Sequence, residues 1–479
     1  MKKHILPLLL AALLCASVLP SCGESDTKET HSSNGEQVGT EDTAPVETTD
    51  PTRVPPAFTD NFNGQEYVIL NGYYNEGKYV STAIYPEETT GDALNDAMYN
   101  RCVSTEEKLG CVITVNEGTL SQIKSNIAAG DDFAHMTFVD LTNIMSLVVQ
   151  NYCIDLYDMP AIDLTKAWWD HNAEDKLSFN GHLFYTFNDT IFTQMDNARA
   201  IYFNKGLAED LQLGDLYALV KDGGWTIDEM QRMGTLAVSD LNGDGKMKVD
   251  DDRVGTIMWG VVGIGELLLT GCESEIMMQG EDGIPYFYCF TEQFTDVYER
   301  VFHFIKDDDN YKDGSVEQFM SGHALFFGGT LASTAAMREM DTDFGILPSP
   351  KYSVDQEKYW NVSPNAHALL VPVTVGDQTF AGTVMEEMAY YSSVELLPAY
   401  FDTMLKGKSA RDEESAAMLD LIHDSISYVI KIVGTKFSDA LYAEMGKGNE
   451  SIASFLASNK VAQETALQEV LDGFNKLNS

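Results

Sequence analysis

The stretch that decides the fold begins with Tyr67-Val68-Ile69-Leu70 and ends with Met136-Thr137-Phe138-Val139. Both runs are short and apolar, and helical and extended patterns alternate between them. Apolar residues at helical spacing fill the stretch from Asp92 to Leu109, and Gly110 supplies a left-handed stop. The patterns predict strands over 67–70, 111–115 and 136–139, and helices over 92–109 and 120–129. Alternating strands and helices predict an α/β lobe with a parallel sheet and right-handed crossovers.

The residues just after these strands are the first candidates for binding. Ligands of parallel sheets lie beyond the carboxyl ends of the strands. Tyr73 and Tyr74 follow the first predicted strand, and Asp140 follows the third. We therefore expect these three side chains near a binding site.

A further helix start is marked at Thr226-Ile227-Asp228-Glu229, which has the capping-box pattern. Trp225 precedes it, and Met230 is spaced to meet that ring as a hydrophobic staple. Trp225 is therefore predicted to be structural. Met230, Met233 and Leu236 continue an apolar stripe that is typical of a core-facing helix.

The helix leads into the sharpest chemical motif, Asp240-Leu241-Asn242-Gly243-Asp244-Gly245-Lys246-Met247-Lys248-Val249-Asp250-Asp251, which fits a calcium loop of the EF-hand type. Its expected ligands are the side chains of Asp240, Asn242, Asp244 and Asp251 and the backbone carbonyl of Lys246. Asp251 replaces the usual bidentate Glu, and Lys248 offers no oxygen, so both weaken the site. A structural Ca²⁺ is the preferred interpretation; a solvated turn without an ion is the alternative.

The amino-terminal residues predict export. Lys2 and Lys3 precede an apolar run, Ile5 to Leu19, that is too short to span a bilayer, as in a secretory signal over 1–21. Ser21-Cys22 also resembles a lipobox, in which the Cys22 thiol carries the lipid, although Pro20 departs from the usual pattern. The alternative is an ordinary signal peptide with an incidental Cys22. Residues 22–56 are polar and acidic, which predicts a disordered tether.

The charge and composition of the chain limit the classes of partner it could bind. The formal net charge is −43, which argues against nucleic acid because phosphate binding needs concentrated Lys and Arg. The remaining chain, from about Ala57, is long enough for two domains and has no second apolar stretch that could span a membrane. Its odd cysteine count does not suggest a disulfide framework. Cys102 is expected in the core, and a bridge between Cys272 and Cys289 stays open.

Enzyme signatures are scarce. The sequence has no G-x-S-x-G, H-E-x-x-H or Walker A motif, and its 9 histidines form no metal spacing. Carboxylate pairs arise by chance in a chain this acidic, so a surface glycan hydrolase with an acidic pair stays an alternative. The prediction is a binder rather than an enzyme.

Short motifs along the whole body resemble the extracellular solute-binding proteins of bacterial ABC importers (family 1, the group that includes maltose-binding protein), and most nearly the large lipoproteins of Gram-positive anaerobes. The matching stretches are Gly91 to Ala97, Trp168-Trp169-Asp170, Tyr202-Phe203-Asn204-Lys205, Trp225-Thr226, the Asp240 loop, Phe344 to Pro348, and Pro350-Lys351 with Gln356 and Tyr359. Each is short, and their order and spacing carry the resemblance.

The resemblance implies two α/β lobes that are joined by crossing segments and close on the ligand by a hinge motion. The expected crossings lie near 183–187, 344–347 and 400–405. The first lobe would then hold residues 57–187 and 348–399. The second would hold residues 188–347 and 400–479, with the calcium loop at 240–251.

The resemblance also places the ligand between the lobes, where aromatic rings stack on sugar rings. Trp259 follows the predicted strand 255–258, at the place of a stacking aromatic, and Asn188 and Asp189 follow the first crossing. Trp168, Trp169 and Asp170 are further candidates, and packing within the lobe is the alternative role for the tandem tryptophans.

Together these features predict a monomeric, lipid-anchored receptor on the extracellular face of the cell membrane. It would capture a carbohydrate, expected to be an oligosaccharide, and deliver it to the permease subunits of an ABC transporter. The abundance of aromatic residues, 22 Tyr, 23 Phe and 5 Trp, favours sugar. A peptide or another polar solute remains the alternative cargo.

Overall fold

The computed structural model describes residues 50–72, 84–307, 309–405, 413–433 and 435–477. They belong to one compact unit, Thr48–Ser479. The predicted signal peptide, Cys22, most of the predicted tether, Tyr73 and Tyr74 lie outside the described residues. None of the helices in the described ranges is long and apolar enough to cross a membrane.

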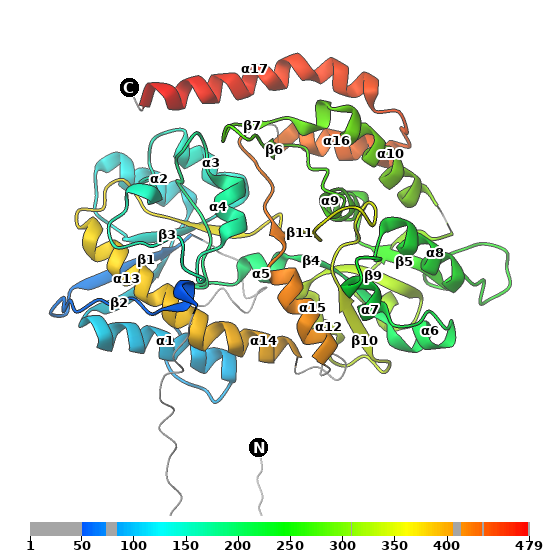
Figure 1. Ribbon diagram of the computed structural model, residues 1–479, viewed down its shortest axis with the longest axis horizontal. Helices are drawn as coiled ribbons and strands as arrows, with labels where there is room; N and C mark the ends of the chain where they lie inside the picture. The colour runs from blue at the N-terminus through cyan, green and yellow to red at the C-terminus, as the bar shows by residue number, and fades with distance from the viewer. Residues whose placement is uncertain (1–49, 73–83, 308, 406–412, 434, 478–479) are drawn as a thin grey trace, which may run out of the picture. The chain divides into compact units, whose positions relative to one another are not determined.

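The first sheet has the strand order β12-β3-β1-β2 (Figure 1). The central strand β1 pairs in parallel with both β2 and β3, and β12 joins β3 antiparallel, with His367 opposite Asp140. The parallel strands confirm the predicted α/β pattern. The strands are β1 (Glu66–Asn71), β2 (Val112–Glu117), β3 (Met136–Asp140) and β12 (His367–Leu370).

The second sheet has the order β10-β4-β9-β5-β8 (Figure 1). β5 pairs in parallel with β8 and β9, while β4 runs antiparallel to β9 and β10. The carboxyl ends of β5, β8 and β9 therefore share an edge with the start of β4. The strands are β4 (Arg199–Asn204), β5 (Val254–Met258), β8 (Tyr311–Asp313), β9 (Ala324–Thr330) and β10 (Phe344–Leu347).

The chain passes between the sheets more than once. It leaves the first sheet after β3, builds the second from β4 to β10, and returns to the first with β12. Residues 183–187, all of them described, form no strand; Thr186 makes a single bridge with Leu369, and the chain enters β4 through α5 (Thr193–Asn197). β11 (Asn361–Val362) and β13 (Ile426–Ser427) pair in parallel.

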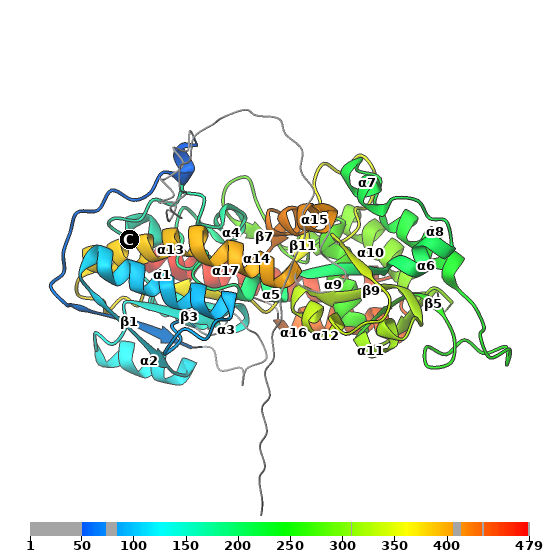
Figure 2. The ribbon, with the colours of Figure 1, turned by 90° about the horizontal axis from the view of Figure 1, so that it is seen from below.

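Helices pack around each sheet. α1, α13 and α14 lie side by side in both views (Figures 1 and 2) and contact one another through α1. Besides α5, the helices that precede β4 or follow β12 are α1 (Ala93–Leu109), α2 (Leu120–Ala129), α3 (Leu141–Val148), α4 (His171–Leu177), α13 (Gln378–Tyr391), the π-helical turn η6 (Ser392–Leu396), α14 (Leu397–Leu405), α15 (Glu413–His423), α16 (Thr435–Lys447) and α17 (Ala453–Leu477).

The helices that follow β4 within the second sheet's segment are α6 (Lys205–Asp210), α7 (Leu216–Lys221), α8 (Ile227–Ala237), α9 (Val261–Gly271), α10 (Glu292–Lys306), α11 (Val316–Met320) and α12 (Thr334–Met337). α8 and α11 pack against β9, and α16 packs against α9. The short 3₁₀ turns are η1 (Pro51–Arg53), η3 (Leu156–Asp158), η4 (Tyr288–Phe290) and η5 (Leu331–Ser333), and β6 (Met278–Gln279) pairs with β7 (Pro285–Tyr286).

Local signals fix several helix ends as predicted. The Asp92 carboxylate accepts the N–H groups of Leu94 and Asn95, and Gly110 ends α1 at φ 62°. Thr226 Oγ1 accepts the N–H of Glu229 at 3.3 Å, so the predicted cap forms. The reciprocal half of the box is replaced, because the Glu229 side chain pairs with Arg232.

Most core predictions are confirmed, but Leu236, predicted on the core-facing stripe of α8, is 50% exposed. Trp225 is fully buried, and its indole N–H donates to the carbonyl of Pro348 at 2.9 Å. Cys102 is fully buried in the core around the first sheet. Cys272 and Cys289 both lie in the described part of the chain and are free thiols, so the open disulfide alternative does not form.

The predicted tether ends earlier than Pro56. Asp50 accepts the N–H of Thr52 and caps η1, and the backbone of that turn bonds to the body. Ala167 donates its N–H to Thr52 and Lys166 its ammonium to Pro51, each at 3.0 Å. The acidic composition predicted disorder up to Pro56, because composition alone cannot reveal hydrogen bonds to the backbone of this turn.

Candidate functional site

The turn after β5 presents Trp259. Gly260 has φ 72°, a left-handed backbone conformation that favours glycine. Helix α9 begins at the next residue, Val261. The Asp313 carboxylate at the end of β8 accepts the Gly260 N–H at 2.8 Å. This turn leaves 47% of Trp259 exposed at the shared carboxyl edge of the second sheet, although large aromatic residues are usually buried.

Arg199, the first residue of β4, supports the Trp259 ring. Its guanidinium carbon lies 5.2 Å from the ring centroid, a cation–π contact. The same guanidinium is ion-paired with Glu266 at 2.7 Å and donates to the carbonyl of Gly263, both on α9. The buried arginine therefore fixes the ring orientation and covers part of it, while the exposed remainder of the ring faces a cavity.

We name this the Trp259 cavity; its volume is about 350 Å³, at the lower end of the usual range for small-molecule sites. Elements associated with both sheets form its walls. Thr142 comes from α3, which follows β3, whereas Trp259 and Glu266 come from the second sheet and α9. The remaining lining residues are Arg199, Val262, Leu269, Thr270, Glu275, Ile276, Pro364, Asn365, Val429, Ile430, Lys431, Val433, Ser438, Asp439 and Tyr442.

Lys431 ties the two sides of this cavity together. Its ammonium donates to the Thr142 hydroxyl at 3.3 Å and to the carbonyl of Pro364 at 2.8 Å. Burial lowers the pKa of Lys431, and the carboxylates of Glu266 and Asp140 partly offset that effect. The cavity therefore has an aromatic wall and a charged, hydrogen-bonding rim.

Asp140 lies beside the Trp259 cavity rather than in its wall. It caps α3, and its carboxylate accepts the N–H groups of Thr142 and Asn143 at 3.0 and 3.2 Å and the Asn143 amide at 2.7 Å. Thr142, two residues later, lines the cavity instead. The Asp140 carboxylate, which the sequence predicted near a binding site, is therefore engaged in capping α3.

Trp168 and Trp169 are packed inside the molecule, at 2% and 4% exposure. Their indole N–H groups both donate to Glu386 on α13, at 3.0 and 2.9 Å. Burial raises the pKa of Glu386 to about 7, and the two indole bonds only partly offset the effect. This geometry corresponds to the packing alternative for the tandem tryptophans.

Glu386 makes stability depend on pH. Its pKa in the folded state is about 7, above the ordinary value of 4.5, so folding favours the protonated form. The contribution of Glu386 to stability is complete below pH 4.5 and is lost as the pH rises through 7. We expect Glu386→Gln to flatten the fall in unfolding free energy over this range. Denaturant melts at several pH values check this, and an unchanged slope would contradict it.

The other predicted polar residues line a different cavity, of about 480 Å³. We name it the Asp189 cavity; Trp169, Asp170, Asn188 and Asp189 lie in its wall. Asp170 caps α4 and accepts the hydroxyl of Tyr428, and burial raises the pKa of Asp170. The two cavities share no lining residue in the described ranges, so the predicted site residues divide between them.

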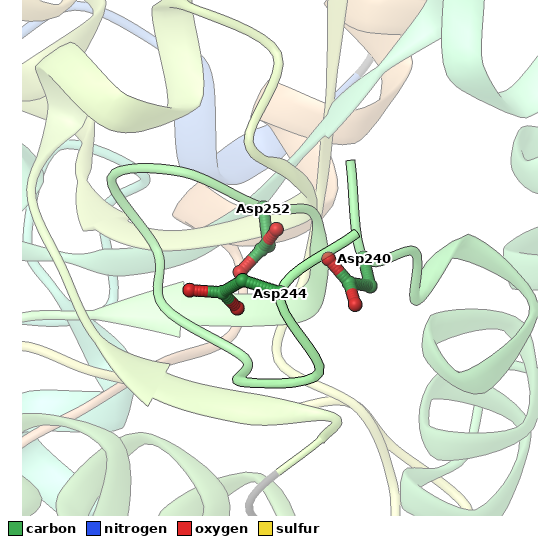
Figure 3. A group of neighbouring side chains, drawn as sticks. All are labelled: Asp240, Asp244 and Asp252. Atoms are coloured by element: carbon green, nitrogen blue, oxygen red, sulfur yellow. The ribbon is translucent and has the colours of Figure 1, made fainter. Parts of the chain in front are cut away.

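The predicted calcium loop joins α8 to β5 (Figure 3). Carboxylate oxygens of Asp240, Asp244 and Asp252 lie within 4.8 Å of one another. Asp252, rather than Asp251, lies with Asp240 and Asp244, and its carboxylate accepts the backbone N–H groups of Leu241 and Lys248. The Asp251 carboxylate pairs with the Lys248 ammonium at 3.4 Å. The Asn242 oxygen accepts the Asp244 N–H at 2.8 Å. The oxygen-rich set around Asp240 suits a hard cation such as Ca²⁺.

The sequence singles out Trp259 but not most of the residues that share its cavity. Arg199, Glu266 and Lys431 are far apart along the chain, and no motif marks them. Thr142 was within reach, because it follows the predicted strand end at Asp140 by two residues.

The sequence matches no protein-family model and no curated protein. A solved cyclo/maltodextrin-binding protein complexed with maltotetraose is similar in structure, with a TM-score of 0.54 and 12% identity over 86% of this chain and 97% of that chain. UspC of M. tuberculosis has a TM-score of 0.53 and 13% identity, over 84% of this chain and 99% of that chain. A family 1 extracellular solute-binding protein from Bifidobacterium longum subsp. infantis has a TM-score of 0.50 and 13% identity, over 86% of this chain and 100% of that chain.

At these identities the likeness establishes the fold. The chain has the two-lobed α/β fold of maltodextrin-binding and family 1 extracellular solute-binding proteins, which confirms the predicted fold class. The two neighbours whose activity is stated are binding proteins.

Proposed function

We propose that this protein captures a carbohydrate in the Trp259 cavity and delivers it to an ABC permease. The observation that carries the proposal is the half-exposed Trp259 ring in a cavity walled by elements of both sheets. A sugar ring offers an apolar C–H face to such an indole and hydroxyl groups to a polar rim. Glu266, Lys431 and Asp439 supply charged partners at that rim.

Cargo would bind both lobes at once and so stabilise a closed state. Two contacts support coupling between the lobes proposed from the sequence, 57–187 with 348–399 and 188–347 with 400–479. Lys176 on α4, in the first lobe, pairs with Glu275, in the second, at 3.2 Å. The ring of Phe474 on α17 lies 4.5 Å from that of Phe179. The permease would then recognise the closed surface.

We further propose that the Cys22 thiol carries a lipid and holds a monomeric receptor on the extracellular face of the membrane. The lipobox-like sequence and the acidic residues behind it support this placement. Incorporation of a labelled fatty acid, lost in Cys22→Ser, would test it.

Calorimetric titration against neutral oligosaccharides, with chromatography of the mixtures afterwards, tests the proposed function. We expect one panel member to bind in a one-to-one complex and to be recovered intact. Turnover of the sugar would instead support the glycan hydrolase, and binding of peptides alone would move the cargo to another class.

We propose that Ca²⁺ binds the Asp240 loop and stabilises the surrounding lobe without contacting cargo. Chelation should therefore lower the melting temperature, because an ion that binds only the native state stabilises it by mass action. Each kcal/mol lost corresponds to about 1 °C in a unit of this size. Asp244→Ala should abolish the response to chelator in a thermal melt.

Asp251→Ala is the matched control for the calcium experiment. Asp251 pairs with Lys248 and lies outside the carboxylate cluster, so this variant should keep the response. A wild type whose melting temperature ignores chelator would show that the loop is only a turn.

A further inference from the structure

One face of α9 lines the Trp259 cavity along its whole length. The lining residues of this helix follow the i, i+4, i+7 and i+8 spacing of a single helical face, and they are Val262, Glu266, Leu269 and Thr270. Exposure falls along this face, from 41% at Val262 to 1% at Leu269 and 4% at Thr270. The helix rises about 12 Å over this distance. The cavity is therefore open beside the start of α9 and closed beside its end.

Buried residues back the closed end of the cavity. Glu275 and Ile276, which follow α9, line the cavity and are both buried. The N–H of Cys289 donates to the Ile276 carbonyl at 3.1 Å, so the η4 turn lies behind this wall. The Glu275 carboxylate pairs with the Lys176 ammonium of α4 at 3.2 Å. A sugar chain that reaches this end therefore stops there.

The open end of the cavity lies beside Trp259. The lining residues that are exposed are Thr142, Trp259, Val262, Asn365 and Asp439, and they mark the side from which a ligand enters. The Arg199 guanidinium lies over one face of the Trp259 ring, 5.2 Å from its centroid, so the other face is left for a sugar ring. Stacking on Trp259 therefore takes place at the entrance.

The volume of the cavity limits how much of a sugar it encloses. The cavity measures about 350 Å³. A hexose ring fills about 200 Å³ at the packing density of about 0.75 that is found in protein interiors. The rise of α9 along the wall is roughly the length of two linked rings. One ring and part of a second therefore fit inside.

Two hydroxyl groups are available towards the closed end, on Thr270 of α9 and on Tyr442 of α16. Neither makes a hydrogen bond to another described residue, and neither belongs to the buried polar atoms that lack both a partner and contact with solvent. Gly265 makes room for the Tyr442 ring, because a Cβ there would lie 3.1 Å from Tyr442 Cδ1.

The Tyr442 hydroxyl lies close to charged residues of the cavity wall. Burial raises the pKa of Tyr442, the carboxylates of Glu266 and Glu275 raise it further, and the Arg199 guanidinium partly offsets them. All three of these charged residues line the cavity. Because a hydroxyl group both donates and accepts, Tyr442 and Thr270 suit the hydroxyl groups of a sugar.

We propose that the Trp259 cavity recognises the end of a linear sugar chain, an inference that rests on the proposed capture of sugar in this same cavity. The terminal ring occupies the closed end and bonds to Thr270 and Tyr442. The second ring stacks on the free face of Trp259, and all further rings lie outside. A cyclic sugar has no terminal ring and does not fit.

Calorimetric titration of the full chain with malto-, cello- and xylo-oligosaccharides of one to six rings tests the proposal. In the series that binds, we expect affinity to rise at least about tenfold from one ring to two, because the second ring adds the stacking contact with Trp259. Rings three to six should add less than about threefold in total. If the malto series binds, α-cyclodextrin should bind at least about 30-fold more weakly than maltohexaose, which has as many rings and two free ends.

Tyr442→Phe and Thr270→Val each remove one hydroxyl group from the closed end. Each should weaken binding about threefold to tenfold, through the loss of one hydrogen bond. The loss should be the same for two-ring and six-ring sugars, because both place a terminal ring there. Tyr359→Phe is the matched control, since Tyr359 is buried too but donates its hydroxyl to the Val220 carbonyl at 3.0 Å and does not line the cavity. It should keep the affinity of the wild type.

Three results would overturn end recognition while sugar still binds. They are an affinity that climbs tenfold or more between the third ring and the sixth, α-cyclodextrin binding as tightly as maltohexaose, or unchanged affinity in both Tyr442→Phe and Thr270→Val. No binding in any of the series would contradict the proposed capture of sugar itself, and end recognition with it.

Discussion

Trp259→Ala is expected to weaken oligosaccharide binding about 30- to 100-fold, which corresponds to roughly 2–3 kcal/mol and is typical of a truncated aromatic anchor. The loss has two sources in the structure. The ring supplies the main apolar surface for a sugar face, and its removal also leaves the Arg199 guanidinium without the aromatic face that lies 5.2 Å away. Calorimetric titration with the best oligosaccharide of the panel measures the change.

The fold should survive this substitution, because 47% of Trp259 is already exposed. Tyr352→Ala is a matched control, since Tyr352 is an aromatic residue of similar exposure, 39%, that does not line the cavity. It should bind the sugar like the wild type. A Trp259→Ala variant that melts much earlier and binds normally would show that the indole serves packing.

Trp168→Ala is expected to show the opposite behaviour and to lower the free energy of unfolding by about 3–5 kcal/mol. The indole is almost fully buried, and its loss creates a cavity and removes one of the two indole donors to Glu386. Denaturant unfolding measures the loss. Oligosaccharide affinity, measured where the variant is still folded, should stay close to that of the wild type.

The comparison of Trp168 with Trp259 separates two interpretations that the sequence left open. If Trp168→Ala were to lose sugar binding while remaining as stable as the wild type, the tandem tryptophans would belong to the binding site. The bonds from Trp168 and Trp169 to Glu386 argue for packing.

The local parts of the fold were predictable, because their signals lie within a few residues of one another. The strand at Tyr67, the helix that begins after Asp92 and the stop at Gly110 all form as predicted. The same holds for the helix start at Thr226 and for the strand that ends just before Trp259. Each of these elements depends on side-chain periodicity or on capping hydrogen bonds within a few residues.

The site was predictable only in part, because its residues meet through the tertiary fold. Trp259 was singled out by its place after a strand, whereas Arg199 and Lys431 reach the same cavity from distant segments. Loop spacing suggested Asp251 as the carboxylate nearest Asp240 and Asp244, yet the backbone turn brings Asp252 close to them. Asn188 and Asp189 are polar and close to the crossing, but the chain turns them towards a second cavity.

A crystal structure of the protein with the tightest-binding oligosaccharide tests the proposed sugar site most directly. We expect sugar density in the Trp259 cavity, with one ring stacked on the exposed part of the indole and hydroxyl groups bonded to Glu266, Lys431 or Asp439. Intact sugar at another place, or a cleaved sugar in the crystal, would contradict the claim that this cavity captures a carbohydrate for transport.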